Sequence, residues 1–195
     1  GALLKNDLGT LELLGENSHR ETRIHAGTVR VESDAALGDP LRAVWLEGLS
    51  DPATLALAPG FSSARELAVS GARNNLLAEG GTVTLSGGLS GHGTLTKRGA
   101  GLLHFTGDDR LFTGEGVLAE GGMRLDGLVA GALTTRAGTV LSGVGEVGSL
   151  EVGKRADIIV LDAPNHQFIP YKVGINLVER VIIDGRVVLV RSVAG

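Results

Sequence analysis

The sequence contains no cysteine and few aromatic residues, and these two absences exclude several kinds of site. Without cysteine the chain can form no disulfide, no thiolate nucleophile and no cysteine-ligated metal site. Aromatic side chains make up 3% of the chain and are too dispersed to predict a sugar-stacking platform: Trp45, Phe61, Phe105, Phe112, Phe168 and Tyr171. Stability must therefore come from aliphatic packing and backbone hydrogen bonds.

A basic surface and a long apolar run are missing as well. The 18 Lys and Arg are scattered among 22 Asp and Glu, which gives a net charge of −4, so we expect no nucleic-acid partner. No apolar run approaches the roughly 20 residues that cross a bilayer, so we expect no membrane insertion. The chain begins with Gly rather than Met and lacks a signal-peptide pattern, which suggests a processed or engineered fragment.

Glycine is abundant, with 31 residues against five prolines, but it does not fall at every third position as in collagen. Between the glycines, short segments alternate aliphatic with polar residues, which is typical of half-buried strands. We predict strands in the segments 9–15, 27–33, 53–60, 81–88, 93–99, 122–127 and 138–145. Residues 62–77 have some helical character, but alternation at Leu67 and Val69 favours a strand, followed by a corner at Asn74 and Asn75.

The dipeptide Gly-Thr opens an alternating triplet at residues 9, 27, 81, 93 and 138, which indicates a repeat protein. In a solenoid each rung, one full circuit of the chain, stacks its strands on those of the next rung. Glycine serves the corners, where positive φ is needed. We expect stacked inward columns to contain Leu11, Val29, Leu85, Leu95, Val140 and Ile159.

Three segments make this expectation specific: 9–38 ("GTLELLGENSHRETRIHAGTVRVESDAALG"), 93–125 and 133–152. They resemble the passenger-associated repeat of bacterial autotransporters, and Asp109 stands where that repeat usually has Asn. The resemblance covers residues 9–152 and implies an all-β, right-handed parallel β-helix on the outside of Gram-negative cells.

The last quarter of the chain resembles another family. Residues 148–188 ("GSLEVGKRADIIVLDAPNHQFIPYKVGINLVERVIIDGRVV") are similar to the C-terminal end of amidohydrolases, imidazolonepropionase in particular. In that family the segment belongs to a small β domain, whereas the metal-binding residues lie in a barrel that this chain lacks. We predict a buried strand at 156–162 and a hairpin at 180–190 around Asp184-Gly185. Residues 1–147 would form the solenoid, and residues 148–195 would cap its C-terminal end.

Several sequence patterns mimic catalytic or binding motifs. The five histidines, His19, His25, His92, His104 and His166, form no His-x-His pair, so we assign them to exposed turns. Gly143, Gly145 and Gly148 spell a dinucleotide fingerprint, and residues 148–155 approach a phosphate loop, but both lead into predicted strands rather than a helix. Asp108 and Asp109 are assigned to a solvated turn.

The sequence thus predicts no catalytic, cofactor-binding or metal-binding residue, no cofactor and no small-molecule substrate. The leading hypothesis is a non-enzymatic structural β-solenoid, engineered or chimeric because it joins two unrelated family patterns, with no evolved substrate. The alternatives are a cell-surface adhesin-type passenger fragment and a metal-dependent amidohydrolase remnant. The first resemblance implies a cell-surface or secreted location and the second a cytoplasmic one, and exposed solenoid ends would permit self-association.

Overall fold

A computed structural model describes residues 1–107, 109, 111–126, 131–143, 158–161, 178–183 and 186–190 of the chain. The chain divides into two compact units, Gly1–Val144 and Gly145–Gly195. The boundary predicted between residues 147 and 148 lies close to this division but outside the described residues.

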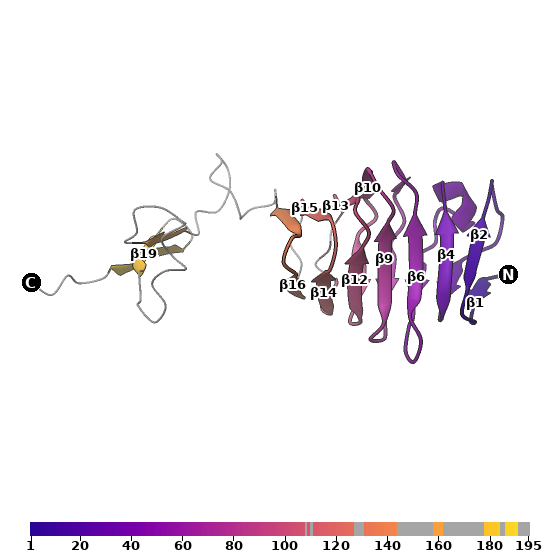
Figure 1. Ribbon diagram of the computed structural model, residues 1–195, viewed down its shortest axis with the longest axis horizontal. Helices are drawn as coiled ribbons and strands as arrows, with labels where there is room; N and C mark the ends of the chain where they lie inside the picture. Colours follow the sequence, from indigo (N-terminus) through magenta and orange to yellow (C-terminus); the bar gives the residue numbers. More distant parts are fainter. Residues whose placement is uncertain are drawn as a thin grey trace, which may run out of the picture. The chain divides into compact units, whose positions relative to one another are not determined.

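The first unit contains three parallel sheets, here called A, B and C, and each of the three central rungs gives one strand to each sheet (Figure 1). Sheet A consists of β1 (Leu3–Lys5), β3 (Thr22–Ile24), β5 (Val44–Leu46), β8 (Leu67–Val69) and β11 (Leu89–Gly91). Sheet B consists of β2 (Thr10–Leu13), β4 (Gly27–Val31), β6 (Ala53–Leu57), β9 (Asn74–Ala78), β12 (Thr94–Arg98), β14 (Glu115–Leu118) and β16 (Ala132–Thr135). Sheet C consists of β7 (Ser62–Ser63), β10 (Thr82–Leu85), β13 (Leu102–Phe105), β15 (Gly122–Leu125) and β17 (Val140–Gly143). The predicted parallel β-helix is confirmed.

The register of sheet B shows how the repeat builds the core. One inward column runs through six strands, from β2 to β14, and contains Leu11, Val29, Leu55, Leu76, Lys97 and Leu118. An outward column beside it is rich in threonine, and in the central rungs its members Thr54, Asn75 and Thr96 follow one another at intervals of 21 residues. Aliphatic residues inside and polar residues outside are the alternation that the sequence predicted.

The predicted inward residues lie in several columns rather than in one. Leu11 and Val29 are paired in sheet B, whereas Leu95 belongs to the neighbouring inward column of that sheet. Leu85 belongs to sheet C. The Gly-Thr dipeptides thus open strands of two different sheets: those at 9, 27 and 93 open strands of sheet B, and those at 81 and 138 open strands of sheet C. The prediction that Val140 lies in an inward column was wrong, because this side chain faces outward and is 67% exposed. The side chain of Ile159 lies outside the described residues.

Sheet A escaped most of the sequence analysis because its strands have three residues each, too few to show alternation. Within 62–77 the predicted strand is confirmed as β8, but Asn74 and Asn75 begin β9 instead of forming a corner. In the second rung a 3₁₀ helix, η1 (Asp34–Leu37), follows β4, where later rungs carry a strand of sheet C. It buries Ala36 and Leu37 in the solenoid core.

The described part of the second unit is a three-stranded antiparallel sheet of β18 (Ile158–Leu161), β19 (Val178–Ile183) and β20 (Arg186–Val190). Pairing of Ile183 with Arg186 confirms the predicted hairpin, and its two turn residues lie outside the described residues. That this unit caps the solenoid stays a prediction. No helix in the described ranges is long and apolar enough to span a membrane.

Candidate functional site

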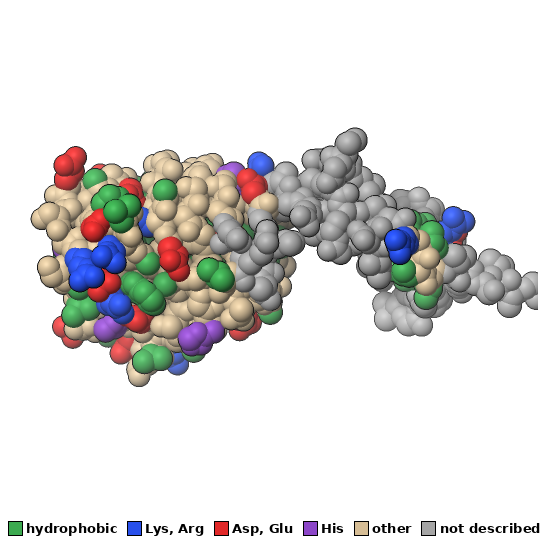
Figure 2. Space-filling model, turned by 180° about the vertical axis from the view of Figure 1, so that it is seen from behind, with side chains coloured by type: hydrophobic (Ala, Val, Ile, Leu, Met, Phe, Trp, Pro, Cys, Tyr) green, Lys and Arg blue, Asp and Glu red, His purple; other side chains and the backbone are tan. Residues whose placement is uncertain are grey.

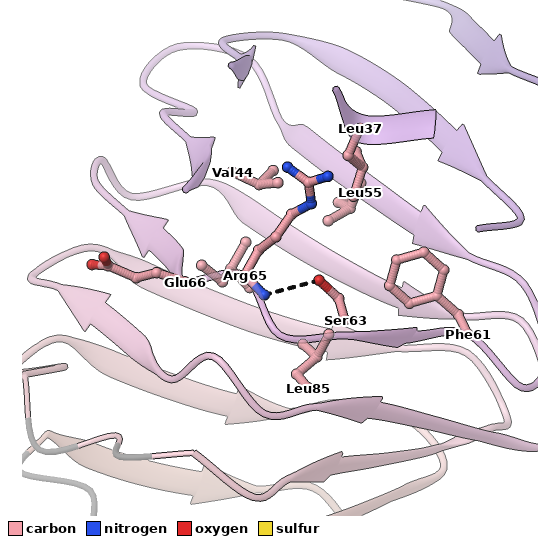
Figure 3. Close-up of a pocket in the computed structure, with 9 residues that line it drawn as sticks. Leu37, Val44, Leu55, Phe61, Ser63, Arg65, Glu66 and Leu85 are labelled. Carbon is pink, nitrogen blue, oxygen red and sulfur yellow. Dashed lines mark hydrogen bonds between the residues drawn. The ribbon is translucent and has the colours of Figure 1, made fainter. Parts of the chain in front are cut away.

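The interior of the solenoid is filled by its own side chains. A cavity of about 10 Å³ lies between Leu37, Phe61, Arg65 and Leu85, and Figure 3 shows aliphatic and aromatic side chains closing around it. This volume is about the minimum that holds a single water molecule. The cavity therefore has no room for a substrate.

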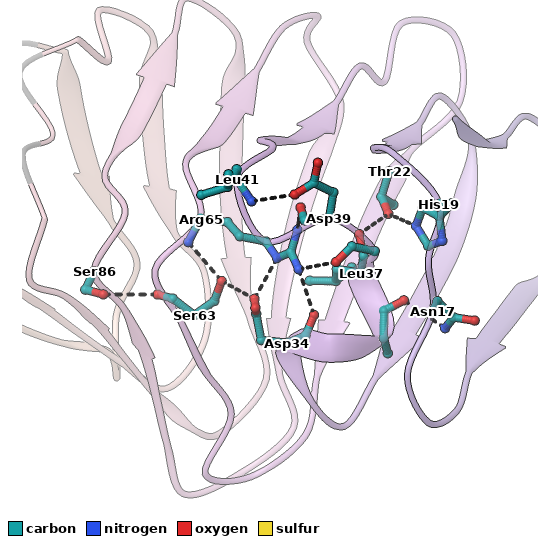
Figure 4. A network of polar contacts seen from close by, with 12 residues as sticks. Asn17, His19, Thr22, Asp34, Leu37, Asp39, Leu41, Ser63, Arg65 and Ser86 are labelled. Atoms are coloured by element: carbon teal, nitrogen blue, oxygen red, sulfur yellow. Dashed lines mark hydrogen bonds and ion pairs between the residues drawn. The ribbon is translucent and has the colours of Figure 1, made fainter. Parts of the chain in front are cut away.

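The buried Arg65 beside this cavity has a structural role (Figure 4). Its side chain is 3% exposed, and its Nε donates to Asp34 Oδ1 at 2.8 Å. Its terminal nitrogens donate to the carbonyl of Asp34 at the start of the 3₁₀ helix and to those of Gly38 and Asp39 just after its end. Because five N–H donors in a rigid fork suit several carbonyl acceptors at once, Arg65 can fasten η1 to β7 and β8.

His19 belongs to the same network. Its Nε2 lies 2.8 Å from Thr22 Oγ1, and Thr22 donates to the Leu37 carbonyl at 3.1 Å. Burial lowers the pKa of His19, and the nearby positive charge of Arg65 lowers it further. A neutral imidazole held by a buried hydroxyl matches a packing role better than a metal-binding one.

A second buried cation, Lys97, occupies an inward position of sheet B and is 0% exposed. Its Nζ donates to the carbonyls of Gly99 and Gly101 at 2.5 Å and of Glu120 at 3.0 Å. Burial lowers the pKa of this ammonium, and the negative charge of Glu120 opposes the shift. Lys97 thus joins two successive corners between sheets B and C.

Two further buried polar residues join neighbouring rungs. Asn74 accepts from the Gly48 amide at 2.7 Å and donates to the carbonyls of Ser70, Gly71 and Thr94. Asp109 is 0% exposed and its Oδ1 accepts from the Leu89 amide at 2.9 Å. The predicted solvated turn is therefore wrong for Asp109, whose carboxylate binds the backbone of the preceding rung.

The remaining motif residues are dispersed. His25 and His92 are exposed between strands, as predicted, whereas His104 lies in β13 with its Nε2 2.8 Å from Asp126 Oδ2. Among the described residues, no three His, Asp or Glu side chains are placed to hold a metal ion. His166, Asp108 and residues 148–155 of the phosphate-loop pattern lie outside the described residues.

The outer surface carries a groove of about 360 Å³ at the corner between sheets A and B. Its shape follows from the connections between the strands of successive rungs. Residues 25–26 form a short link between longer connections at 6–9 and 47–52. The short link contributes His25 and Ala26 to the lining. The loop 47–52, here called the wall of the groove, contributes Leu49, Ser50 and Asp51 besides Glu47.

A ladder of polar side chains runs along this groove. Asn6, His25, Glu47 and Ser70 each follow directly after a strand of sheet A, and they line the groove together. Backbone hydrogen bonds from His25 to Lys5, from Glu47 to Ile24 and from Ser70 to Leu46 continue the parallel pairing beyond the strand ends. The four residues therefore occupy equivalent positions in four successive rungs, about 4.8 Å apart.

Glu47 is the best-fixed member of this polar ladder. Arg23 Nη1 donates to both of its carboxylate oxygens, at 3.2 and 3.3 Å, and His25 Nε2 lies 2.9 Å from Oε2. The Arg23 guanidinium in turn lies 4.6 Å from the centre of the Trp45 ring. Burial alone would lower the pKa of Arg23, but hydrogen bonds to Glu21 and Glu47 outweigh it and raise that pKa.

This site was not predicted from the sequence, because most strands of sheet A were not predicted. Only after the three-residue strands are recognised does it become visible that a polar residue follows each of β1, β3, β5 and β8. The length of loop 47–52 also shapes the groove, but it matters only by comparison with the shorter connections of the adjacent rungs, which are far away in the sequence.

Elsewhere on the solenoid, opposite charges alternate. Arg30 on the outer face of sheet B pairs with Glu12, Glu32 and Glu79, and hydrogen bonds from these carboxylates, Glu79 foremost, raise its pKa. On the face shown in Figure 2, basic and acidic side chains lie side by side on the solenoid. Such a surface offers no uniform field to a highly charged polymer.

Comparisons with known proteins find two unrelated similarities. No family model matches the sequence, and no solved structure matches it significantly. Over 132 residues, 67% of this chain and 4% of the relative, it is 36% identical to the autotransporter Adhesin BmaC of Brucella suis biovar 1 (strain 1330). Over 54 residues, 28% of the chain and 13% of the relative, it is 50% identical to an imidazolonepropionase of Parabacteroides distasonis. A second imidazolonepropionase, from Alkaliphilus metalliredigens, is 43% identical over 58 residues, 14% of its length.

The chain thus spans a small part of each of these relatives. As the sequence patterns predicted, one polypeptide joins a segment similar to an autotransporter adhesin with a shorter segment similar to imidazolonepropionases. The larger similarity agrees with the parallel β-solenoid, whose described interior is packed with aliphatic and aromatic side chains and whose polar groove lies on the outside.

Proposed function

We propose that this chain is an adhesin-type passenger fragment that binds other cells or their surface molecules through the outside of its solenoid. The observation that carries the proposal is the 36% identity to an autotransporter adhesin over 67% of the chain. The closed interior supports it, since a cavity of about 10 Å³ leaves the outer faces and corners as the surface for a partner. The cell-surface location follows from the same similarity.

The test is a saturation experiment with the purified chain. Fluorescently labelled protein is titrated onto mammalian and bacterial cells, and excess unlabelled protein is added as competitor. We expect saturable binding that the competitor removes, and a core variant such as Leu76→Asp, which cannot fold around a buried carboxylate, should lose it. Binding that rises linearly without saturation on every cell type would refute the proposal.

The leading alternative is a solenoid of engineered or chimeric origin that folds but has no evolved ligand. The joining of two unrelated similarities in one chain favours it. It predicts a cooperative unfolding transition together with no saturable binding to any cell, so the same titration distinguishes the two hypotheses.

We also propose that the chain is not an enzyme. The segment similar to imidazolonepropionases spans 13–14% of those relatives, and the described residues assemble no metal-binding group. Elemental analysis of the purified chain should find no stoichiometric zinc, iron or manganese. Stoichiometric metal accompanied by hydrolysis of a cyclic amide would instead support an amidohydrolase remnant.

A further inference from the structure

We propose that the groove at the corner between sheets A and B binds a neutral oligosaccharide, lying along the polar ladder of Asn6, His25, Glu47 and Ser70. This inference rests on the proposed adhesive function and assigns to it a site and a class of ligand. Three properties of the groove carry it: its shape, its repeating hydrogen-bonding groups and its balance of charge.

The shape suits a short linear ligand. A volume of about 360 Å³ falls at the lower end of the range of small-molecule sites, which begins near 300 Å³. The groove crosses four rungs, because its lining residues come from the connections after β1, β3, β5 and β8. The loop 47–52 also contributes Leu49, Ser50 and Asp51 to the lining, so a ligand would contact this loop as well as the ladder.

The lining presents hydrogen-bonding groups at regular intervals. The amide of Asn6, the imidazole of His25, the carboxylate of Glu47 and the hydroxyl of Ser70 belong to four successive rungs, whose strands are about 4.8 Å apart. Ser50 and Asp51 add a hydroxyl and a carboxylate from the wall. A ladder of mixed donors and acceptors matches a chain of linked rings that carry a hydroxyl on nearly every carbon.

Charge selects a neutral ligand over a charged or an apolar one. Arg23 and His25 already contact the Glu47 carboxylate, so Glu47 is oriented as an acceptor while its charge is largely balanced. The second carboxylate of the lining, that of Asp51, disfavours phosphate, sulfate or sialic acid. An apolar ligand would leave the polar lining without partners, which costs free energy for each buried group.

The Glu47 carboxylate is also fixed before a ligand arrives. Arg23 is held between the Trp45 ring and the Glu47 carboxylate, and both side chains project outward from β5 and the residue after it. A site that is already ordered loses little side-chain entropy on binding. Leu49, 74% exposed on the wall, provides apolar surface for the carbon-bound hydrogens of a sugar ring.

The first experiment uses the full chain on a printed array of neutral oligosaccharides built from glucose, galactose, mannose and N-acetylglucosamine. Sialylated and sulfated glycans and a basic peptide are printed beside them. We expect binding to a subset of the neutral set, with affinity that changes little with salt. Binding to no neutral glycan, or binding only to the anionic glycans or the basic peptide, would overturn the inference.

The second experiment places the ligand in the groove. Ser50→Trp puts a large ring on the exposed wall, and Asp51→Asn removes one carboxylate while keeping its shape. We expect Ser50→Trp to weaken binding of the best neutral oligosaccharide by at least about tenfold, and Asp51→Asn to weaken it by about threefold to tenfold, by loss of one charge-assisted hydrogen bond. Thr134→Trp, on the exposed outer face of sheet B, and Glu115→Asn, on the same sheet, are the matched controls and should bind as the original chain does.

Circular dichroism and urea unfolding of all four variants show whether each one is folded. If Ser50→Trp is folded and still binds glycan with full affinity, the groove is not the site. The inference and the proposed function fail separately: saturable cell adhesion that Ser50→Trp leaves unchanged overturns the groove assignment alone. Glycan binding in the groove without cell adhesion would instead refute the proposed function alone.

Discussion

The central and the terminal rungs of the solenoid follow the same alternating pattern, yet they bury it to different extents. Leu76 in the central strand β9 is 0% exposed, whereas Leu11, in the same column at the N-terminal end, is half-buried. At the other end Leu141 in β17 is 42% exposed. Because each rung contacts only its neighbours, a side chain is fully buried only where a rung lies on both sides. Stability should therefore be concentrated in the centre.

The largest expected effect tests this difference on the core itself. Leu76→Ala removes a fully buried side chain from a column closed on both sides and should lower the free energy of unfolding by about 4 kcal/mol. Leu141→Ala removes one that is already 42% exposed and should cost less than about 1 kcal/mol. Urea unfolding followed by circular dichroism measures both. Equal losses would show that the terminal rung is as tightly packed as the centre.

Corner glycines provide the second contrast. Gly91 has φ of 101°, and a Cβ there would lie 2.1 Å from the Val69 carbonyl oxygen of the preceding rung. Gly138, with φ of 81°, would meet nothing within 4 Å. Both alanine variants carry the strain of positive φ, which should lower the free energy of unfolding by about 1 kcal/mol. Only Gly91→Ala must also displace backbone of the neighbouring rung, so we expect it to lower the free energy of unfolding by about 3 kcal/mol. Similar losses of unfolding free energy in the two variants would mean that the neighbouring rung moves aside at little cost.

The difference between contacts within one strand and contacts between rungs explains what could be predicted from the sequence. Many strands of sheets B and C have four or five residues, and alternation revealed β4, β10 and β12, among others. Strands β9, β13, β14 and β16 were not predicted, although they are of similar length. The groove was not predictable, because Asn6, His25 and Glu47 become neighbours only through the register of sheet A. Lys97 and Asp109 were not predictable either. Their partners are backbone groups of another rung, the Glu120 carbonyl and the Leu89 amide, and backbone groups leave no trace in the sequence.

Two inward lysines extend the comparison to buried charge. Lys97 is fully buried in the centre and donates to three carbonyls, while Lys5, at an inward position of the N-terminal rung, is half-buried and bonds the carbonyls of Asp7 and Ala26. Replacement of Lys97 by Met leaves three acceptors without their donor and should cost about 2 kcal/mol. Lys5→Met, whose acceptors remain open to water, should cost less than about 0.5 kcal/mol.

Lys97 should also leave a signature in the pH dependence of stability. Since burial lowers its pKa in the folded chain below the unfolded value of 10.5, the unfolded state holds more protons between the two values. Stability should therefore rise with pH as the solution approaches pH 10.5, and this rise should be smaller in Lys97→Met. Unfolding free energies measured from pH 7 to 10.5 in both chains give the difference. A Lys97→Met chain with an unchanged slope would show that the ammonium stays fully charged in the core.

The smallest effect on the fold, but an informative one, concerns β1, the edge strand of sheet A. Lys5 occupies the column that continues through Ile24, Leu46 and Val69, all of which are buried. An inward-pointing charge on an edge strand opposes pairing with another chain, because the partner would have to desolvate it. Lys5→Leu should therefore leave the unfolding free energy nearly unchanged but raise the dimer fraction in sedimentation equilibrium. Arg98→Leu, which makes the same exchange on the outer face of the central strand β12, should remain as monomeric as the original chain. If both variants associate equally, the added surface hydrophobicity is the cause of association. The self-association predicted for the solenoid ends then does not use the edge formed by β1.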